Sequence, residues 1–133
     1  SPKLLQKIDQ IAQELATSPR VLIQVDLSGE SSKHGASLDD TRRMFDLASK
    51  CQAVHVRGLM LLPPWHIDPE RVRPYFRRLR ELRDSLINDG VDSIFVSELS
   101  MGMSNDFEVA IQEGSTMVRV GTAIFGSRTK TQK

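Results

Sequence analysis

A chain of 133 residues with 39% hydrophobic content suits one compact domain with enough apolar side chains for a core. Its 18 lysines and arginines nearly balance 17 acidic residues, and a charge of +1 is too small for the basic surface that nucleic acid binding requires. With one cysteine, three scattered histidines and no apolar stretch near the roughly 20 residues that cross a bilayer, we expect a cytoplasmic protein without disulfide, metal or membrane partner.

The first half of the chain alternates helical and extended patterns. Apolar residues from Leu4 to Leu15 recur at three- and four-residue steps, which is the period of an amphipathic helix. Ser37 can cap a second helix because its hydroxyl accepts from an amide of the first turn. In chain order the pattern predicts a helix over 3–16, a strand over 21–27, a loop over 28–37, a helix over about 38–52 and a strand over 54–62.

The second half continues the same alternation. Asp68 followed by Pro69 is typical of a helix start, and Pro74 should kink or restart that helix. The basic cluster RVRPYFRRLR, residues 71–80, lies beside acidic residues and favours a solvated helix face over an anion or RNA patch. In chain order the pattern predicts a helix ending at Asn88-Asp89-Gly90, a strand over 93–99, a short helix capped by Ser104 and ended by Gly114, and a strand over 117–121.

Strands alternating with helices over the whole length predict parallel β/α units, which gives the α/β fold class. Two architectures stay open, an open doubly wound sheet and part of a TIM-type (β/α)8 barrel. The last strand favours the barrel, because Val118 and Val120 suit helix packing while Arg119 on the opposite face would point into a barrel interior. Since a complete barrel takes around 250 residues, four units in residues 1–133 predict a single domain that forms half of one.

The segment 104–126 contains the parts of a phosphate site in a barrel. Ser104 would direct a hydroxyl and nearby amides toward an anion. Gly121 lets the backbone approach closely, and Thr122 adds an amide and a hydroxyl. Arg119 stays protonated, so its guanidinium could donate to an anion or a ring nitrogen but would not act as an acid.

Other interpretations of the same residues remain open. Ser104 could be an ordinary helix cap, Gly121 could simply end a strand, and Arg119 could pair with Glu98. A barrel enzyme acting on a small phosphorylated metabolite would need a general base, for which the sequence offers only Asp26, Glu30 and Glu98 near strand ends. An interaction module could use Trp65 as an aromatic anchor, although loop packing is the favoured explanation of that residue.

Three specific motifs also stand in the chain: VLIQVDLSGESSKHG, VRGLMLLPP and LSMGMSNDFEVAIQEGSTMVRVGTAIFGSR. Together they resemble the second half of the pyridoxal phosphate homeostasis proteins, the YggS type, over about residues 21–128. The resemblance implies a fold-type III barrel, similar to the cofactor domain of alanine racemase, that holds pyridoxal 5′-phosphate without established catalytic turnover. It also implies a role in vitamin B6 and amino-acid balance in the cytoplasm.

By position, the resemblance implies that Ser104, Gly121 and Thr122 bind the cofactor phosphate and that Arg119 faces the pyridine nitrogen, with Met103 lining the pocket. The family's Schiff-base lysine sits on the first barrel strand, in a half that this chain does not contain. None of the lysines present lies in an apolar strand: Lys3, Lys7, Lys33, Lys50, Lys130 and Lys133. Because half a barrel leaves two strand edges open, we expect either a partner carrying the missing N-terminal half or self-association.

Overall fold

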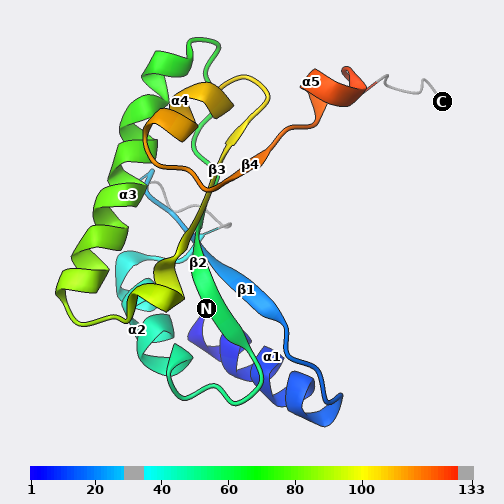
Figure 1. Cartoon of the computed structure of the whole chain (residues 1–133), viewed down its shortest axis with the longest axis vertical. Helices are drawn as coiled ribbons and strands as arrows, with labels where there is room; N and C mark the ends of the chain where they lie inside the picture. Colours follow the sequence, from blue (N-terminus) through cyan, green and yellow to red (C-terminus); the bar gives the residue numbers. More distant parts are fainter. Residues whose placement is uncertain (29–34, 129–133) are drawn as a thin grey trace.

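A computed structural model describes residues 1–28 and 35–128 as a four-stranded parallel sheet with helices packed on it (Figure 1). The strand order is β1-β2-β3-β4, so each strand pairs with its neighbour in sequence. This confirms the predicted α/β class and parallel topology. The elements are α1 (Pro2–Glu14), β1 (Arg20–Val25), α2 (Leu38–Ala48), β2 (His55–Leu61), η1 (Pro69–Arg71), α3 (Arg73–Asn88), η2 (Ser93–Val96), β3 (Glu98–Met103), α4 (Phe107–Gln112), β4 (Met117–Arg119) and α5 (Thr122–Phe125).

Local sequence signals account for most of the helix boundaries. Ser37 Oγ accepts from the Asp40 amide, as expected of a cap, although α2 ends at Ala48, before the predicted boundary. Asp68 caps η1 through the Glu70 amide, and Pro74 then lies in the first turn of α3, so the proline restarts the helix. Gly90 has a φ of 102°, a conformation that glycine adopts without strain, directly after α3 ends.

The predicted strand over 93–99 is wrong, because residues 93–96 form the helical turn η2 and β3 begins at Glu98. The Asp92 carboxylate accepts from the Ile94 amide, so a polar cap overrides the β propensity of that segment. The strand begins where pairing begins: Glu98 lies opposite Gly58 of β2. A Cβ on Gly58 would lie 2.0 Å from the Glu98 carbonyl oxygen, so this close approach requires glycine.

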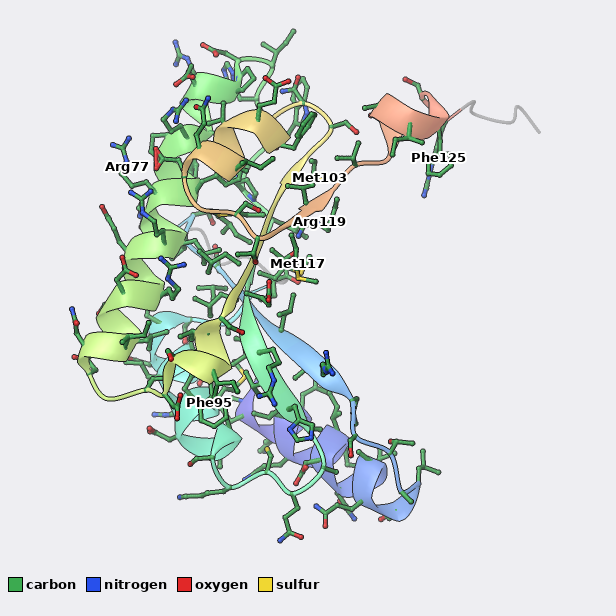
Figure 2. All side chains as sticks on the ribbon, in the orientation of Figure 1. Arg77, Phe95, Met103, Met117, Arg119 and Phe125 are labelled. Atoms are coloured by element: carbon green, nitrogen blue, oxygen red, sulfur yellow. The ribbon has the colours of Figure 1, made fainter. Side chains whose placement is uncertain are left out.

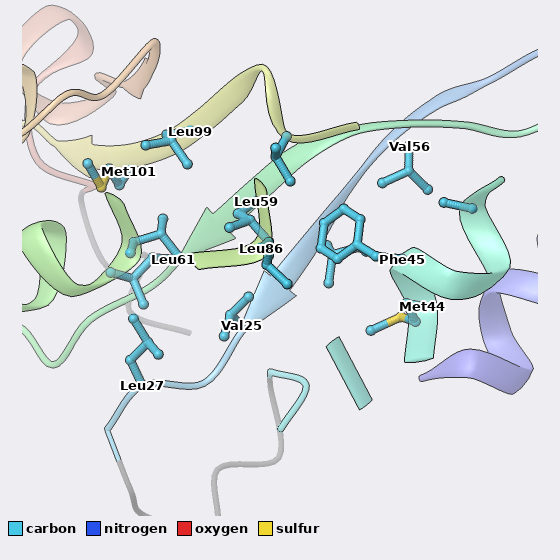
Figure 3. Packing of buried hydrophobic residues seen from close by; sticks show 14 of the residues in the cluster. Val25, Leu27, Met44, Phe45, Val56, Leu59, Leu61, Leu86, Leu99 and Met101 are labelled. Carbon is cyan, nitrogen blue, oxygen red and sulfur yellow. The ribbon is translucent and has the colours of Figure 1, made fainter. Parts of the chain in front are cut away.

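The sheet has one face covered by helices and one that is only partly covered. On the covered face, Ile23, Leu59 and Leu99 lie in register across three strands and are buried. Figure 3 shows Leu59 and Leu99 in this core. On the opposite face, the register row consists of Gln24, Met60, Ser100 and Met117. Met117 is 45% exposed, because within the described residues nothing packs over that end of the row.

The sheet edges are also incompletely paired within the described part of the chain. β4 pairs with β3 alone, and the outer edge of β1 carries one bridge, from Val25 to Ala36. A groove of about 460 Å³ opens beside β1, lined mainly by apolar side chains of α1, β1 and α2. The partly exposed row and this groove therefore leave apolar surface uncovered within the described residues.

Three arginines of the basic cluster 71–80 form ion pairs that connect two helices. Arg73, Arg77 and Arg80 of α3 place guanidinium nitrogens 3.4, 3.0 and 3.1 Å from the carboxylate of Glu113, which follows α4 and is buried. The hydrogen bond from Arg77 is the main reason that the pKa of Glu113 lies below its usual value. These contacts join α3 to α4 on the outer side of the sheet, while Arg71 and Arg78 are exposed, as the solvated-face interpretation expects.

Asp9 of α1 provides a second buried carboxylate that the sequence pattern did not single out. Its oxygens accept from the amides of Ala53 at 2.8 Å and Val54 at 2.9 Å, and from Gln52 at 3.2 Å. The Val54 and Ala53 hydrogen bonds are the main reason that the pKa of Asp9 lies below its usual value, since they stabilise the ionised form. Asp9 therefore fixes α1 to the turn that leads into β2.

We predict that Asp9→Ala lowers the free energy of unfolding by about 2 kcal/mol, because it leaves buried amides without acceptors. Because the folded-state pKa is lowered, the stabilisation is present above the unfolded-state pKa of about 3.9 and is lost as pH falls through the folded value. Urea unfolding of both proteins followed by circular dichroism at pH 7 and at successively lower pH should show the difference shrinking below about pH 4. Asp46→Ala, an exposed position on α2, is the matched control and should unfold like wild type.

Candidate functional site

The residues singled out in the sequence gather at the carboxyl ends of β3 and β4. Met103 is the last residue of β3 and Arg119 the last of β4, and the two are paired in the sheet register. Figure 2 shows their side chains close together, with Met117 below them. In parallel α/β sheets, ligands bind at this edge of the sheet, because loops from several strands meet there.

Ser104 does not cap α4 as predicted. Its Oγ accepts from the amides of Gly121 at 3.2 Å and Ala123 at 3.0 Å, so it joins the turn after β3 to the start of α5. α4 begins at Phe107, after a turn in which the Asp106 carboxylate accepts from the Met103 amide at 2.8 Å. The interpretation of Ser104 as an ordinary helix cap is therefore wrong, and the hydroxyl instead links the two segments of the predicted phosphate site.

Gly121 and Thr122 are both exposed at this junction. A Cβ placed on Gly121 would meet no atom within 4 Å, so the space beside its Cα is open within the described residues. The amides of Gly121 and Ala123 donate to Ser104 Oγ, and Thr122, with its own amide and hydroxyl, lies exposed between them. A hydroxyl and an amide of this kind can donate to a phosphate group.

Arg119 does not pair with Glu98, so that alternative is wrong. Its Nη1 donates to Ser100 Oγ at 2.6 Å and its Nη2 to the Leu61 carbonyl at 3.0 Å. Glu98 instead accepts a hydrogen bond from the Thr116 hydroxyl. Burial lowers the pKa of Arg119 below its usual value, partly opposed by the charge of Asp106, yet a guanidinium stays protonated at neutral pH.

Two residues of this region were missed by sequence reasoning. Ser100 is a buried polar residue on the strand face opposite Leu99, and its place between apolar neighbours was the available signal. Asn105 follows Ser104, and its Nδ2 donates to the His66 carbonyl at 2.8 Å, which ties the loop after β2 to the site. Nothing in the sequence indicated that contact, because 39 positions separate the two residues.

The residues suggested for other functions lie differently. Asp26 follows β1 and accepts from the amide and hydroxyl of Ser28, while Glu98 starts β3, at the opposite end of the strand from the site. Glu30 lies outside the described residues. Trp65 is 71% exposed, so loop packing does not account for its indole.

The lysines in the described part of the chain are not placed as Schiff-base residues. Lys3 and Lys7 are exposed on α1, which Figure 1 shows at the other end of the molecule from α5, and Lys50 is exposed beyond α2. Lys33, Lys130 and Lys133 lie outside the described residues. Within those bounds the arrangement can bind an anion and present a fixed cation, but it offers no nucleophilic amine.

Residues 1–28 and 35–128 were also searched for metal sites and for membrane-spanning helices. No three His, Cys, Asp or Glu side chains come together there as a metal site. None of the helices described has the length and apolarity needed to cross a membrane.

The comparisons with known proteins agree on one family. Residues 1–129 match the alanine racemase N-terminal domain family. The pyridoxal phosphate homeostasis protein of Aquifex aeolicus is 49% identical over 108 residues, which are 81% of this chain and 46% of that protein. The Homo sapiens protein of the same name is 36% identical over 140 residues, covering 100% of this chain and 50% of that protein.

A solved structure is similar in fold and sequence. PipY of Synechococcus elongatus, determined with pyridoxal 5′-phosphate (PLP) bound, superposes with a TM-score of 0.84 at 35% identity. The match covers 95% of this chain and 57% of that one. The chain therefore spans about half the length of the curated relatives that it matches.

The Ser104 junction can be tested without any ligand. We predict that Ser104→Ala increases amide hydrogen exchange at Gly121 and Ala123 by about fivefold, since a net hydrogen bond of about 1 kcal/mol corresponds to that factor. Exchange measured by NMR on the 133-residue chain reports both amides directly. Ser49→Ala, which removes an exposed hydroxyl after α2, should leave the two amides unchanged. Unchanged exchange in Ser104→Ala would contradict the link between the two segments.

Proposed function

This chain belongs to the alanine racemase N-terminal domain family, and we propose that it supplies part of a PLP site used in intracellular PLP, vitamin B6 and amino-acid homeostasis. We further propose that it is the second half of a TIM-type barrel, that residues 1–133 form one domain of that barrel and that it works in the cytoplasm. The relatives named pyridoxal phosphate homeostasis proteins and the PLP-bound PipY structure support the cofactor assignment.

The observation that carries the proposal is the convergence of donors at the ends of β3 and β4. Ser104 contacts the amides that begin α5, and Gly121 and Thr122 lie open beside it. These groups would hold the cofactor phosphate, with Met103, 48% exposed at the end of β3, lining the pocket. A phosphate dianion would accept from hydroxyls and amides alike.

Arg119 would face the pyridine nitrogen of the cofactor. When bound, PLP supplies an electron sink, and that sink is strongest when the ring nitrogen is protonated. A guanidinium at this position donates to the nitrogen and disfavours its protonation, because two cations would then face each other. Arg119 therefore suits a protein that holds the cofactor more than one that uses it for turnover, and we propose that the chain has no catalytic role.

A barrel enzyme acting on a small phosphorylated metabolite is the alternative. Asp26 favours it, because a carboxylate at the carboxyl end of a barrel strand is where general bases occur. The donors around Ser104 would bind the phosphate of such a metabolite equally well. The two functions differ in the role of Arg119. Its guanidinium would donate to the ring nitrogen of PLP, whereas a metabolite without a ring nitrogen offers no such acceptor.

The cofactor proposal predicts specific losses of PLP affinity. The chain can replace the matched segment of the Aquifex aeolicus protein, to which it is 49% identical, so that the resulting chimera contains a complete set of barrel strands. We expect the chimera to bind PLP, and Arg119→Ala and Thr122→Ala each to weaken binding by about tenfold, as loss of one charge-assisted hydrogen bond implies. Binding is measured by titration of the cofactor's absorbance.

Matched controls separate binding from folding. Arg78→Ala on α3 and Thr17→Ala after α1 remove the same side chains from exposed positions and should leave PLP affinity unchanged. A folded chimera that does not bind PLP, or one in which Arg119→Ala and Thr122→Ala bind as tightly as the controls, would be inconsistent with the proposed site. Binding of small phosphorylated metabolites in preference to PLP would favour the alternative.

The open edges predict association. We expect the 133-residue chain to purify with a polypeptide carrying the missing half or to self-associate, because the edges of β1 and β4 and the face containing Met117 lack cover within the described residues. Light scattering measures the mass in solution, and a monodisperse monomer would contradict this expectation. Denaturing mass spectrometry after borohydride reduction would identify a second polypeptide and show whether it carries a pyridoxyl group.

A further inference from the structure

We propose that Ser100 is a positioning residue that fixes the guanidinium of Arg119 through a neutral hydrogen bond. This inference rests on the proposed function, in which Arg119 faces the ring nitrogen of the cofactor. The contact is short: Arg119 Nη1 lies 2.6 Å from Ser100 Oγ, and Nη2 lies 3.0 Å from the Leu61 carbonyl oxygen. The two acceptors come from β3 and β2, so Arg119 reaches across the inner face of the sheet from β4.

Ser100 is placed for this contact by the sheet register. Ser100 of β3 lies opposite Met60 of β2 on one side and Met117 of β4 on the other. The next register pair between β3 and β4 joins Met103 to Arg119. Methionine sulfur accepts hydrogen bonds weakly, so Ser100 supplies the strong side-chain acceptor between these two neighbours. With Ser100 only 5% exposed, its hydroxyl has little water to compete with the guanidinium.

The two acceptors are neutral, unlike those of the other arginines that bridge elements. Arg73, Arg77 and Arg80 all form ion pairs with the carboxylate of Glu113. Within the described residues, no salt bridge includes Arg119. The nearby Asp106 carboxylate accepts instead from the Met103 amide. A hydroxyl and a carbonyl therefore fix the direction of the Arg119 guanidinium without a direct ion pair.

This arrangement leaves donors for a ligand. A guanidinium has five N–H groups in one plane, and the contacts to Ser100 and Leu61 use two of them. Once the plane is fixed, the remaining N–H directions are fixed as well. A ring acceptor then meets a donor that needs no reorientation, which is the condition for tight and directional binding.

The first test uses the unliganded 133-residue chain. Heteronuclear NMR of arginine side chains measures how fast the Arg119 guanidinium rotates about its Nε–Cζ bond. We expect Ser100→Ala to increase that rate about tenfold, as loss of one hydrogen bond to a charged group implies, and Ser100→Thr, which keeps the hydroxyl, to restore slow rotation. Ser115→Ala is the matched control, because the Ser115 hydroxyl lies between β3 and β4 and donates to backbone carbonyls without contacting Arg119. Equal rotation rates in wild type and Ser100→Ala would overturn the inference.

The second test uses the chimera with the Aquifex aeolicus protein and PLP itself as the probe. We expect Ser100→Ala to weaken PLP binding about fivefold and to raise the pH at which the bound ring nitrogen titrates, as followed by absorbance, while Ser115→Ala changes neither. Should Ser100→Ala fail to fold, Ser100→Cys, which is close in size and a weak acceptor, replaces it.

The outcomes separate this inference from the proposed function. If the wild-type chimera binds PLP but Ser100→Ala leaves affinity and titration unchanged, the positioning role is wrong and the cofactor site stands. If the wild-type chimera does not bind PLP, the proposed function fails, and the positioning role of Ser100 toward a cofactor fails with it. Slow rotation of Arg119 that depends on Ser100, together with a Ser100-dependent titration, supports both.

Discussion

The parallel pairing of β3 with β4 is the constraint on which the candidate site depends. Pairing Ser100 with Met117 and Met103 with Arg119 brings two carboxyl ends to one edge of the sheet. Only then can the Ser104 hydroxyl accept from amides 17 and 19 positions away. Because the strands are parallel, the connecting segment must return along the outside as α4, and the buried Glu113 that follows it fixes this crossover to three arginines of α3.

The protein uses arginine in two physically different ways. On the outer side, three guanidiniums form ion pairs with one buried carboxylate, which joins the helices. On the inner side, the hydrogen bonds that Arg119 makes within the described residues go to a hydroxyl and a carbonyl, so neutral acceptors fix its direction. Partial burial strengthens that charge toward a ligand, since little water screens it, and this is consistent with a site that holds an aromatic nitrogen and a phosphate.

The two faces of the sheet differ in how far their side chains are buried. On one face, Ile23, Leu59 and Leu99 are buried beneath helices of this chain. The row that contains Met60 and Met117 is only partly covered, and a groove follows the edge of β1. Exposed apolar surface of this kind is typical of an interaction site, and the matched relatives are about twice as long as the segment they share with this chain.

The sequence by itself determined the order of most helices and strands and the parallel α/β class, and it predicted five residues that the structure brings to one edge of the sheet. Periodicity, caps such as Ser37 and Asp68, and stops such as Gly90 act between near neighbours, so a linear pattern records them. Only the tertiary structure decided the start of β3, the partners of Ser104 and Arg119, and the buried contacts of Asp9. Each of those depends on which backbone groups arrive nearby from distant positions, and hydrogen-bonding side chains accept any suitable partner that packing brings within about 3 Å.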